Sequence, residues 1–478
     1  MQAPPGPDSR DPRGTVAPAG IAPPVRPPWS ASERTVPRRV IRPVRRFMRL
    51  EIAGGAVLLA ASVVALIWAN LAPSAYEAFW ATELTIRLGE WSLTEDLGHV
   101  VNDGLMTIFF LVIGLEVKRE LVLGELSTVR AALLPAFAAL GGVVVPVLIF
   151  VTLTAGDGTA RGWGIPIATD VAFALAALAA LGRRVPTALM AFLLGVAVVD
   201  DIVAIGVVAV AYSDALAFPW LAVAGVGLVA MWSARQLGVR HLGVYLVLGV
   251  AVWFAVLESG VHATIAGVAI ALLTPVRPFQ TPSVVSREAV LTAQRTDDHP
   301  AVPDGDAGEW RRLAWLSREA VSPLTRLEHA LHPWSSFVVL PIFALANAGI
   351  VIDRGSIDAA TGSPVAVAVA LALVAGKAVG LTAGAALAVG LGLSRLPRSV
   401  RWLHVVGVGL LAGIGFTVSL FITELAYADP DVVDSAKLGV LAGSVVAAIL
   451  GTLLLRAASR GRSRATRPGP AVSPPPPA

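Results

Sequence analysis

The chain of 478 residues is 55% hydrophobic and only 15% charged, and its mean hydropathy is +0.73. Soluble domains carry about 25% charged residues, so most of this chain is expected to lie in a lipid bilayer. The sequence contains no cysteine, which excludes disulfides and thiolate metal sites. The basic residues gather in the tails and in short loops between apolar runs. That distribution is typical of membrane topology and argues against a nucleic-acid partner.

Both ends of the chain have the composition of disordered segments. Residues 1–48 are rich in proline and arginine without apolar periodicity, and residues 457–478 end in a proline run. We therefore expect two cytoplasmic tails around a membrane domain at 49–456. The first tail lacks the apolar stretch of a signal peptide, so the first apolar segment is expected to act as an uncleaved start.

Twelve apolar segments lie between the tails, each long enough, or nearly so, to cross a hydrocarbon core of about 30 Å. They are at about 50–69, 97–117, 131–153, 163–181, 186–212, 218–234, 242–256, 260–274, 328–350, 364–390, 402–426 and 435–455. The seventh and eighth are short, and the alternative is a single broken hairpin that never spans. The positive-inside rule favours twelve spans. With both tails cytoplasmic, 32 basic residues fall on that side and three, Arg87, Arg161 and Arg354, on the other.

Two segments outside the apolar runs have their own patterns. Residues 83–93 alternate apolar and polar side chains around Gly89 and Glu90, which predicts a small periplasmic β-hairpin. An isolated hairpin is marginally stable in water, so we expect it to pair with a second copy of the chain. Residues 276–322 are polar and mixed in charge, and are expected to form a flexible cytoplasmic loop insertion rather than a domain.

Two adjacent carboxylates lie midway along the fifth apolar segment. An ionisable group at membrane depth costs at least about 2.5–3.5 kcal/mol and is functional by default. Asp200 and Asp201 stand in the run V-V-D-D-I-V. Adjacent residues of a helix diverge by about 100°, so one carboxylate can face a cavity while the other reaches a neighbouring helix. The alternative, a helix end mistaken for a span centre, is disfavoured because apolar residues continue on both sides.

The fourth segment, about 163–181, begins with G-W-G-I-P-I-A and continues into Thr169 and Asp170. Glycines and a proline inside an apolar run predict a discontinuous helix. Unwound backbone frees carbonyl oxygens as cation ligands, Thr169 adds a hydroxyl, and Asp170 can neutralise the positive end of a half-helix. The alternative is that the span simply starts here, with Thr169 or Asp170 as its cap.

Lys377 lies near the middle of the tenth segment. A buried ammonium needs an anionic partner, and the carboxylates above are the only deep ones. The alternative is that the side chain extends to the membrane surface. Glycines predict a second discontinuous helix at about 402–426. One broken helix in each of two three-segment groups, 131–212 and 364–455, indicates inverted-topology repeats with a site at the membrane midplane.

Taken together, these motifs resemble the NhaA-type Na⁺/H⁺ antiporters. The resemblance runs from about residue 48 to 456 and is interrupted by the 276–322 segment. The residues that carry it are F-F-L-V-I-G-L-E-V-K-R-E at 109–120, A-T-D at 168–170, V-D-D-I at 199–202, S-G-V-H-A-T at 259–264, R-L-E-H-A-L-H-P-W at 326–334 and G-I-G-F-T at 413–417.

This resemblance implies a pH-regulated, electrogenic antiporter of the bacterial inner membrane, without a cofactor and not an enzyme. It would exchange one Na⁺ or Li⁺ for two protons and form a homodimer partly through the hairpin. Asp200, Asp201, Asp170 and Thr169 match the sodium site, and Lys377 matches the partner of Asp200. The positions that match the cytoplasmic funnel and the pH response are Glu116, Glu120, His262, Glu328, His329 and His332. For His262, the alternative is a structural histidine near a helix end.

Two other classes of protein also use acidic residues in membrane spans. An intramembrane aspartyl protease needs two aspartates on different helices, which the adjacent pair and the buried lysine do not fit. A cation channel is expected to carry rings of acid along an open path rather than a lysine at the site. Peptide cleavage in proteoliposomes would distinguish the protease, and single-channel currents would distinguish the channel.

Overall fold

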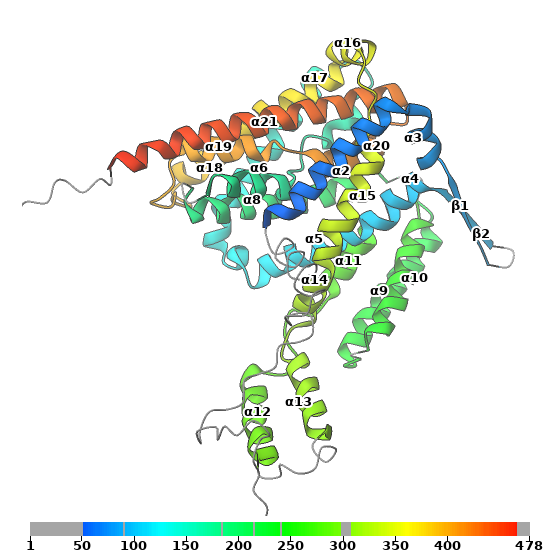
Figure 1. Cartoon of the computed structure of the whole chain (residues 1–478), viewed down its shortest axis with the longest axis vertical. Coiled ribbons are helices and arrows are strands. Elements are labelled where there is room, and N and C mark those ends of the chain that lie inside the picture. The colour runs from blue at the N-terminus through cyan, green and yellow to red at the C-terminus, as the bar shows by residue number, and fades with distance from the viewer. Residues whose placement is uncertain are drawn as a thin grey trace, which may run out of the picture. The chain divides into compact units, whose positions relative to one another are not determined.

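The computed structural model describes residues 51–88, 91–182, 185–213, 216–239, 241–297 and 307–465. These residues are mostly helical and carry one small two-stranded sheet (Figure 1). The helical class predicted from the sequence is therefore confirmed. The predicted tail at 1–48 and the last part of the predicted C-terminal tail, residues 466–478, lie outside the described residues.

Within the described residues, eight helices are long and apolar enough to cross a membrane. The chain is therefore a multi-pass membrane protein. The eight are α2 (Glu51–Leu71), the continuous run of α4 (Leu97–His99), η3 (Val100–Leu105) and α5 (Met106–Val122), α6 (Val129–Leu153), α8 (Thr187–Ala211), α9 (Phe218–Gln236), the run of α14 (Pro323–Trp334), η7 (Ser335–Val339) and α15 (Leu340–Asn347), the run of α17 (Pro364–Leu371), η8 (Ala372–Gly376) and α18 (Lys377–Gly390), and α21 (Pro430–Ala465).

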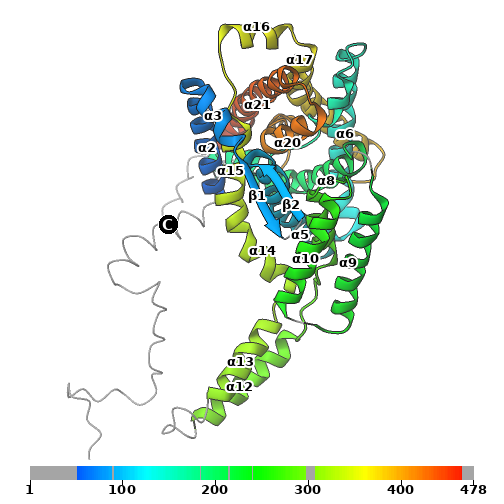
Figure 2. The ribbon, with the colours of Figure 1, turned by 90° about the vertical axis from the view of Figure 1, so that its right-hand side faces the viewer.

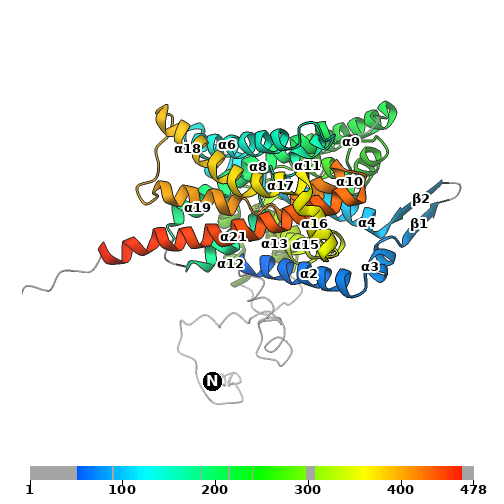
Figure 3. The same cartoon turned by 90° about the horizontal axis from the view of Figure 1, so that it is seen from above.

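A ninth crossing is supplied if α19 (Trp402–Ala412) and α20 (Phe416–Ala426) count as one span, bent by 46° at its break. Three shorter apolar helices are α7 (Val171–Ala180), α10 (Leu242–Leu257) and α11 (Thr264–Leu273). Figure 3 shows α21 running beside α19. Short helices at the ends of the spans are α3 (Pro73–Trp80), η4 (Glu125–Ser127), η5 (Ala160–Gly164) and α16 (Arg354–Gly362). The total of twelve spans and the inverted repeats stay predictions.

Helices α6 and α18 pack unusually closely because glycines line their contact. Gly376, Gly380 and Gly384 recur every four residues and so lie on one helix face. A Cβ atom on Gly380 would collide with the carbonyl of Gly141, and one on Gly384 with the carbonyl of Phe137. Small residues let helix backbones approach in this way inside a membrane. The packing fixes the start of α18, where Lys377 follows the π-helical turn η8. Such turns are frequent at functional sites.

The predicted β-hairpin is present. Strands β1 (Glu83–Leu88) and β2 (Trp91–Asp96) pair antiparallel, with Glu83 opposite Asp96 and Leu88 opposite Trp91. Figure 2 shows the two strands side by side. The second strand extends three residues beyond the predicted end at 93, and Asp96 then caps α4 by accepting a hydrogen bond from His99 N at 2.7 Å. Its periplasmic side and its role in a dimer stay predictions.

The prediction of a flexible loop at 276–322 is wrong over most of that segment. Helices α12 (Pro282–Asp297) and α13 (Ala307–Glu319) contact one another as a helical pair (Figure 1). Val285 and Leu316 are buried, and Gln280 N donates to Glu319 O at 3.1 Å, which closes the base of the pair. Polarity and length suggested a loop, but apolar residues in α13 recur at helical spacing. Residues 298–306 lie outside the described residues.

The predicted start of the C-terminal tail at 457 is also wrong, because α21 continues to Ala465. The last span and the helix beyond it form one element of 36 residues. Leu455 and Ala458 are buried, and the Arg401 guanidinium donates to the Ala458 carbonyl. The charged residues after 456 indicate the end of the apolar stretch, not the end of the helix.

Candidate functional site

Two interrupted helices contact one another at their breaks. Residues 165–170 separate η5 from α7, and residues 413–415 separate α19 from α20. Asp170 N donates to the Ile414 carbonyl at 2.6 Å, and Ser419 Oγ donates to the Ile165 carbonyl at 2.6 Å. Breaks occur in both segments for which the sequence predicts discontinuity. Asp170 N and the Ser419 hydroxyl of α20 thus satisfy carbonyls at the two interruptions, and buried backbone groups need such partners at membrane depth.

The Asp170 carboxylate lies at the N-termini of two half-helices. Its Oδ1 accepts from Phe173 N at 3.2 Å and so caps α7. Its Oδ2 accepts from both Thr417 N at 3.2 Å and Thr417 Oγ1 at 2.7 Å, in the first turn of α20. Negative charge is favourable at both helix N-termini. The capping alternative for Asp170 therefore describes a real contact, and the carboxylate binds α20 rather than Lys377.

Lys377 forms a buried ion pair with Asp200. Its Nζ lies 2.7 Å from Asp200 Oδ2, and both side chains are almost completely buried. Thr169 Oγ1 lies 2.8 Å from the same Oδ2, and Lys377 Nζ also donates to the Ile167 carbonyl. The lysine therefore does not extend to the membrane surface. Carbonyl and hydroxyl groups of the non-helical residues 165–170 complete the polar environment that a buried charge pair needs.

Asp201 differs from its neighbour because it has no such partners. It is 9% exposed, and the described residues give its carboxylate no hydrogen bond or ion pair. Asp200 Oδ1 is buried and likewise without a hydrogen-bond partner among the described residues. Glu116 and Asp170 lie within electrostatic reach of Asp201. Buried acceptor atoms without donors are costly, and they are the ligands that a hard cation or a proton would take.

The predicted sodium ligands are only partly gathered together. The structure joins Thr169 to Asp200 directly, whereas Asp170 is bonded to α20. Across the described ranges, no three His, Cys, Asp or Glu side chains are grouped closely enough to hold a metal ion. The described residues therefore offer a cation two adjacent carboxylates, with backbone carbonyls and the Thr169 hydroxyl nearby, and no closed cage of ligands.

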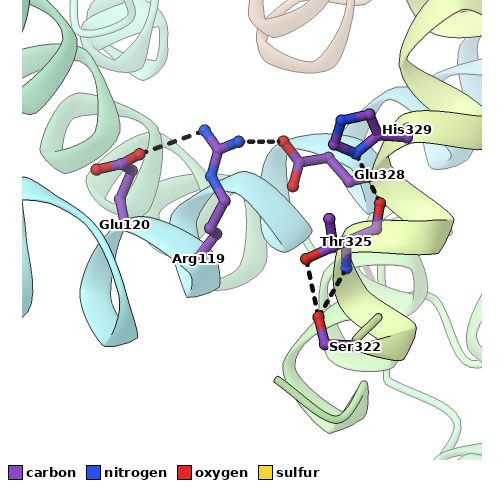
Figure 4. Close-up of polar contacts among 6 residues, drawn as sticks. All are labelled: Arg119, Glu120, Ser322, Thr325, Glu328 and His329. Carbon is purple, nitrogen blue, oxygen red and sulfur yellow. Dashed lines mark hydrogen bonds and ion pairs between the residues drawn. The ribbon is translucent and has the colours of Figure 1, made fainter. Parts of the chain in front are cut away.

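Arg119 is the centre of a second polar cluster. Its Nη1 lies 2.7 Å from Glu328 Oε1, and its Nη2 lies 3.3 Å from Glu120 Oε1 (Figure 4). Both carboxylates are buried. His329 instead bonds to the Thr325 carbonyl of its own helix at 2.8 Å, and His332 is exposed. The structure thus brings two of the predicted pH-response residues together through an arginine that sequence reasoning missed.

Glu116 lies one helical turn before Glu120 on α5. It is within electrostatic reach of Arg119 and Glu328, and also of Asp201. Its charge can therefore act on both the arginine cluster and the carboxylate pair. His262 lies elsewhere, between α10 and α11, with its ring centre 6.4 Å from that of Phe421 in α20.

A cleft of about 550 Å³ opens beside the arginine cluster. Its lining comes from α5, α6, α8 and the short helix η4, and includes Glu120, Thr128, Ala191 and Leu194. Leu194 is seven residues before Asp201 on α8, which is about 10 Å along the helix axis. The cleft therefore lies on the same side of the carboxylate pair as Glu120 and the first half of α8.

The family described as Na⁺/H⁺ antiporter 1 matches residues 45–455 of the chain. The chain belongs to this family. The match includes both broken helices, the Lys377–Asp200 pair and the arginine cluster. The resemblance found in the motifs is thereby confirmed.

Curated members of the family cover most of the chain. It is 42% identical over 431 residues to the Na⁺/H⁺ antiporter NhaA of Oleidesulfovibrio alaskensis, which covers 89% of this chain and 96% of that protein. It is 43% identical over 428 residues to the Na⁺/H⁺ antiporter NhaA of Rhodopirellula baltica, covering 87% and 94%. It is 43% identical over 434 residues to the Na⁺/H⁺ antiporter NhaA 2 of Myxococcus xanthus, covering 88% and 91%.

Proposed function

We propose that this protein is a Na⁺/H⁺ antiporter of the bacterial inner membrane, with Asp200 and Asp201 as the shared site for sodium and protons. Family membership and the names of its relatives support the reaction. The observation that carries the assignment is the nearly buried Asp201 carboxylate, which has no hydrogen-bond or ion-pair partner among the described residues. It lies next to the paired Asp200, so one site contains both a free and a compensated carboxylate.

Competition for the same oxygen atoms accounts for exchange. A carboxylate lone pair binds either a proton or a cation, so sodium and protons exclude one another. When such a site opens to one side of the membrane at a time, each ion leaves only as the other enters. No cofactor is needed, because the site residues and the ion gradients supply the whole reaction.

The proposed stoichiometry is two protons inward for each Na⁺ or Li⁺ outward. Asp201 carries one proton, and the Lys377–Asp200 pair supplies the second, because sodium at Asp200 competes with the ammonium for the same oxygen. Two protons against one sodium move a net charge. The cycle therefore gains about 2.3 kcal/mol per 100 mV of membrane potential.

The proposed topology has twelve spans, inverted repeats and both termini in the cytoplasm. The eight long helices, the bent pair and the three shorter apolar helices fall at the twelve predicted segments, which supports this count. The two proposed repeats each place a broken helix between continuous ones, α7 between α6 and α8, and α19–α20 between α18 and α21. The breaks contact one another, as expected for a site at the interface of repeats.

The proposed pH response acts through the arginine cluster. Glu120 lines the cleft and is joined to Glu328 through Arg119, and Glu116 is within electrostatic reach of Arg119 and of Asp201. A change of charge there would act on ion entry. We further propose a homodimer that pairs hairpins of two copies, with membrane lipids as the remaining partners and no nucleic acid.

Sodium-triggered proton movement in everted vesicles tests the proposed function. Vesicles are first acidified by respiration, and Na⁺, Li⁺ or K⁺ is then added across a range of pH. The expected result is proton release on adding Na⁺ or Li⁺ and a steep dependence on pH. Release that equals that of vesicles without the protein would contradict antiport, and cation currents without proton release would indicate a channel.

A further inference from the structure

Two tyrosines hold the segment that leads into the first broken helix. We call residues 159–170 the strap; it contains η5 and the non-helical residues that lead into α7. Tyr212 follows the last residue of α8, and Tyr427 follows the last residue of α20. The sequence has four tyrosines, and these two directly follow the helices that carry the carboxylate pair and Thr417. Neither has a role in the site described above.

Their hydroxyl groups bind consecutive turns of the strap. Tyr212 Oη donates to the Arg161 carbonyl at 2.8 Å and accepts from Gly164 N at 3.2 Å. Tyr427 Oη donates to the Thr159 carbonyl at 2.6 Å. Gly162 and Gly164 make this approach possible, because a Cβ atom on either would collide with the tyrosine hydroxyl that lies against it. The two glycines thus admit the tyrosines as well as interrupting the helix.

The tyrosines lie at the opposite end of α8 from the cleft. Along this helix, Leu194 lines the cleft, Asp200 and Asp201 follow, and Tyr212 comes after the last turn. The distance from Asp201 to Tyr212 is about 16 Å along the axis. On the tyrosine side, Ile165 and Ile167 of the strap are completely buried. In this conformation, the site therefore has a cleft on one side and a packed, hydrogen-bonded strap on the other.

We propose that Tyr212 and Tyr427 form a latch that keeps the ion site closed on the side opposite the cleft. The inference rests on the proposed antiport, because alternating access requires a closure that opens and closes in each cycle. The latch acts through the strap, which supplies the Ile167 carbonyl and Thr169 to the Lys377–Asp200 pair. Both tyrosines are positioning residues, since neither contacts that pair.

Neutral hydroxyls suit a closure that must be reversible. Burial raises the pKa of Tyr212 to about 12 and also raises the pKa of Tyr427 above its ordinary value. Both hydroxyls therefore stay protonated, and remain donors, throughout the physiological range. Each bond contributes little net stability, so the strap can be released without breaking a charge pair.

Conservative variants test the latch. Tyr212→Phe and Tyr427→Phe remove the hydroxyls and keep the rings, and Tyr245→Phe is the matched control. The Tyr245 hydroxyl also binds a backbone carbonyl, that of Val239 at 2.8 Å, but it lies on α10. Hydrogen exchange of the strap amides is measured in the purified protein, and half-saturating Na⁺ is measured in vesicles of both orientations.

We expect both latch variants to speed hydrogen exchange of the strap amides, and Tyr245→Phe to leave that rate unchanged. The Na⁺ concentration that half-saturates transport from the tyrosine face should fall, because the state open to that face becomes more populated. The expected decrease is about two- to tenfold, which corresponds to the net free energy of one hydrogen bond. At the cleft face this concentration should not fall. Unchanged strap exchange, or an equal rise in half-saturating Na⁺ at both faces, would overturn the latch. If the parent protein did not exchange Na⁺ for H⁺, the proposed function would be refuted instead. Hydrogen exchange of the strap amides would then decide whether the hydroxyls hold the strap.

Discussion

At the scale of single residues, the Lys377–Asp200 pair sets the character of the site. The ammonium and the carboxylate are 2.7 Å apart in a region without solvent access. Removing one member of such a pair leaves an uncompensated buried charge, whereas removing both removes the charge together with its desolvation cost. The pair therefore has a testable energetic signature that is separate from transport.

A double-mutant cycle on this pair checks both aspects. Lys377→Ala should lower the free energy of unfolding by about 3–5 kcal/mol, and Asp200→Asn combined with Lys377→Gln should recover much of that loss. The double variant should still exchange ions but carry one charge fewer per cycle. Thermal unfolding and a membrane-potential dye in proteoliposomes measure the two effects. Additive stability losses, or an unchanged charge per cycle, would remove the pair from the mechanism.

Residue chemistry allowed part of the site to be predicted. A lysine in an apolar run needs an anion, which predicted one of the deep aspartates as its partner. The choice of Asp200 among them came from the resemblance to the antiporter family. Arg119 was missed because it lies at the end of a span, where a basic residue has the ordinary role of setting topology. Its contact with Glu328 joins positions 209 residues apart, which local sequence patterns do not contain.

At the scale of elements, glycine and proline made the breaks predictable. Gly413 and Gly415 lie at the interruption between α19 and α20, and Pro166 lies in the turn between η5 and α7. The π-helical turn before Lys377 was not predictable, because its sequence, A-L-V-A-G, is compatible with ordinary helix. A loop was predicted at 276–322 because the overall polarity of the segment was given more weight than the helical spacing of the apolar residues in α13. The structure has helices α12 and α13 there.

Close packing of α6 against α18 gives a prediction at this scale. Gly380→Ala should lower the free energy of unfolding by about 1–3 kcal/mol, because the added methyl group overpacks a contact between two backbones. Gly390→Ala, on the same helix, is the matched control, since a Cβ atom there meets nothing within 4 Å. Thermal unfolding in detergent measures both. Equal stability of the two variants would contradict the close approach that holds Lys377 in place.

The hairpin gives a second prediction. Deleting residues 83–93 should weaken dimerisation while sparing transport, because the strands lie apart from the carboxylate pair and have few contacts outside their own sheet. The deletion leaves Asp96, the cap of α4, in place. Native mass spectrometry in mild detergent measures the dimer fraction. An unchanged dimer population would show that copies of the chain associate through another surface.

At the scale of the whole molecule, the cleft, the carboxylate pair and Tyr212, which binds the strap, follow one another along α8. The apolar segments of the membrane domain could be predicted from the sequence because hydropathy and charge are averaged over many residues. The contact between the two breaks could not be predicted from the sequence, since it depends on how helices distant in the chain pack. Beside that contact, Thr169 and Lys377 both bind the Asp200 carboxylate, and the Ile167 carbonyl accepts from Lys377.

The central claim is that Asp201 is the carboxylate at which sodium and protons compete. The most direct measurement is sodium-triggered proton release from everted vesicles that contain Asp201→Asn, at an expression level and thermal stability matched to the parent. The amide keeps the size of the side chain but cannot bind a proton in exchange for a cation. We predict that the variant folds normally and that its exchange is abolished. Exchange of Na⁺ for H⁺ at the parent rate would contradict the account.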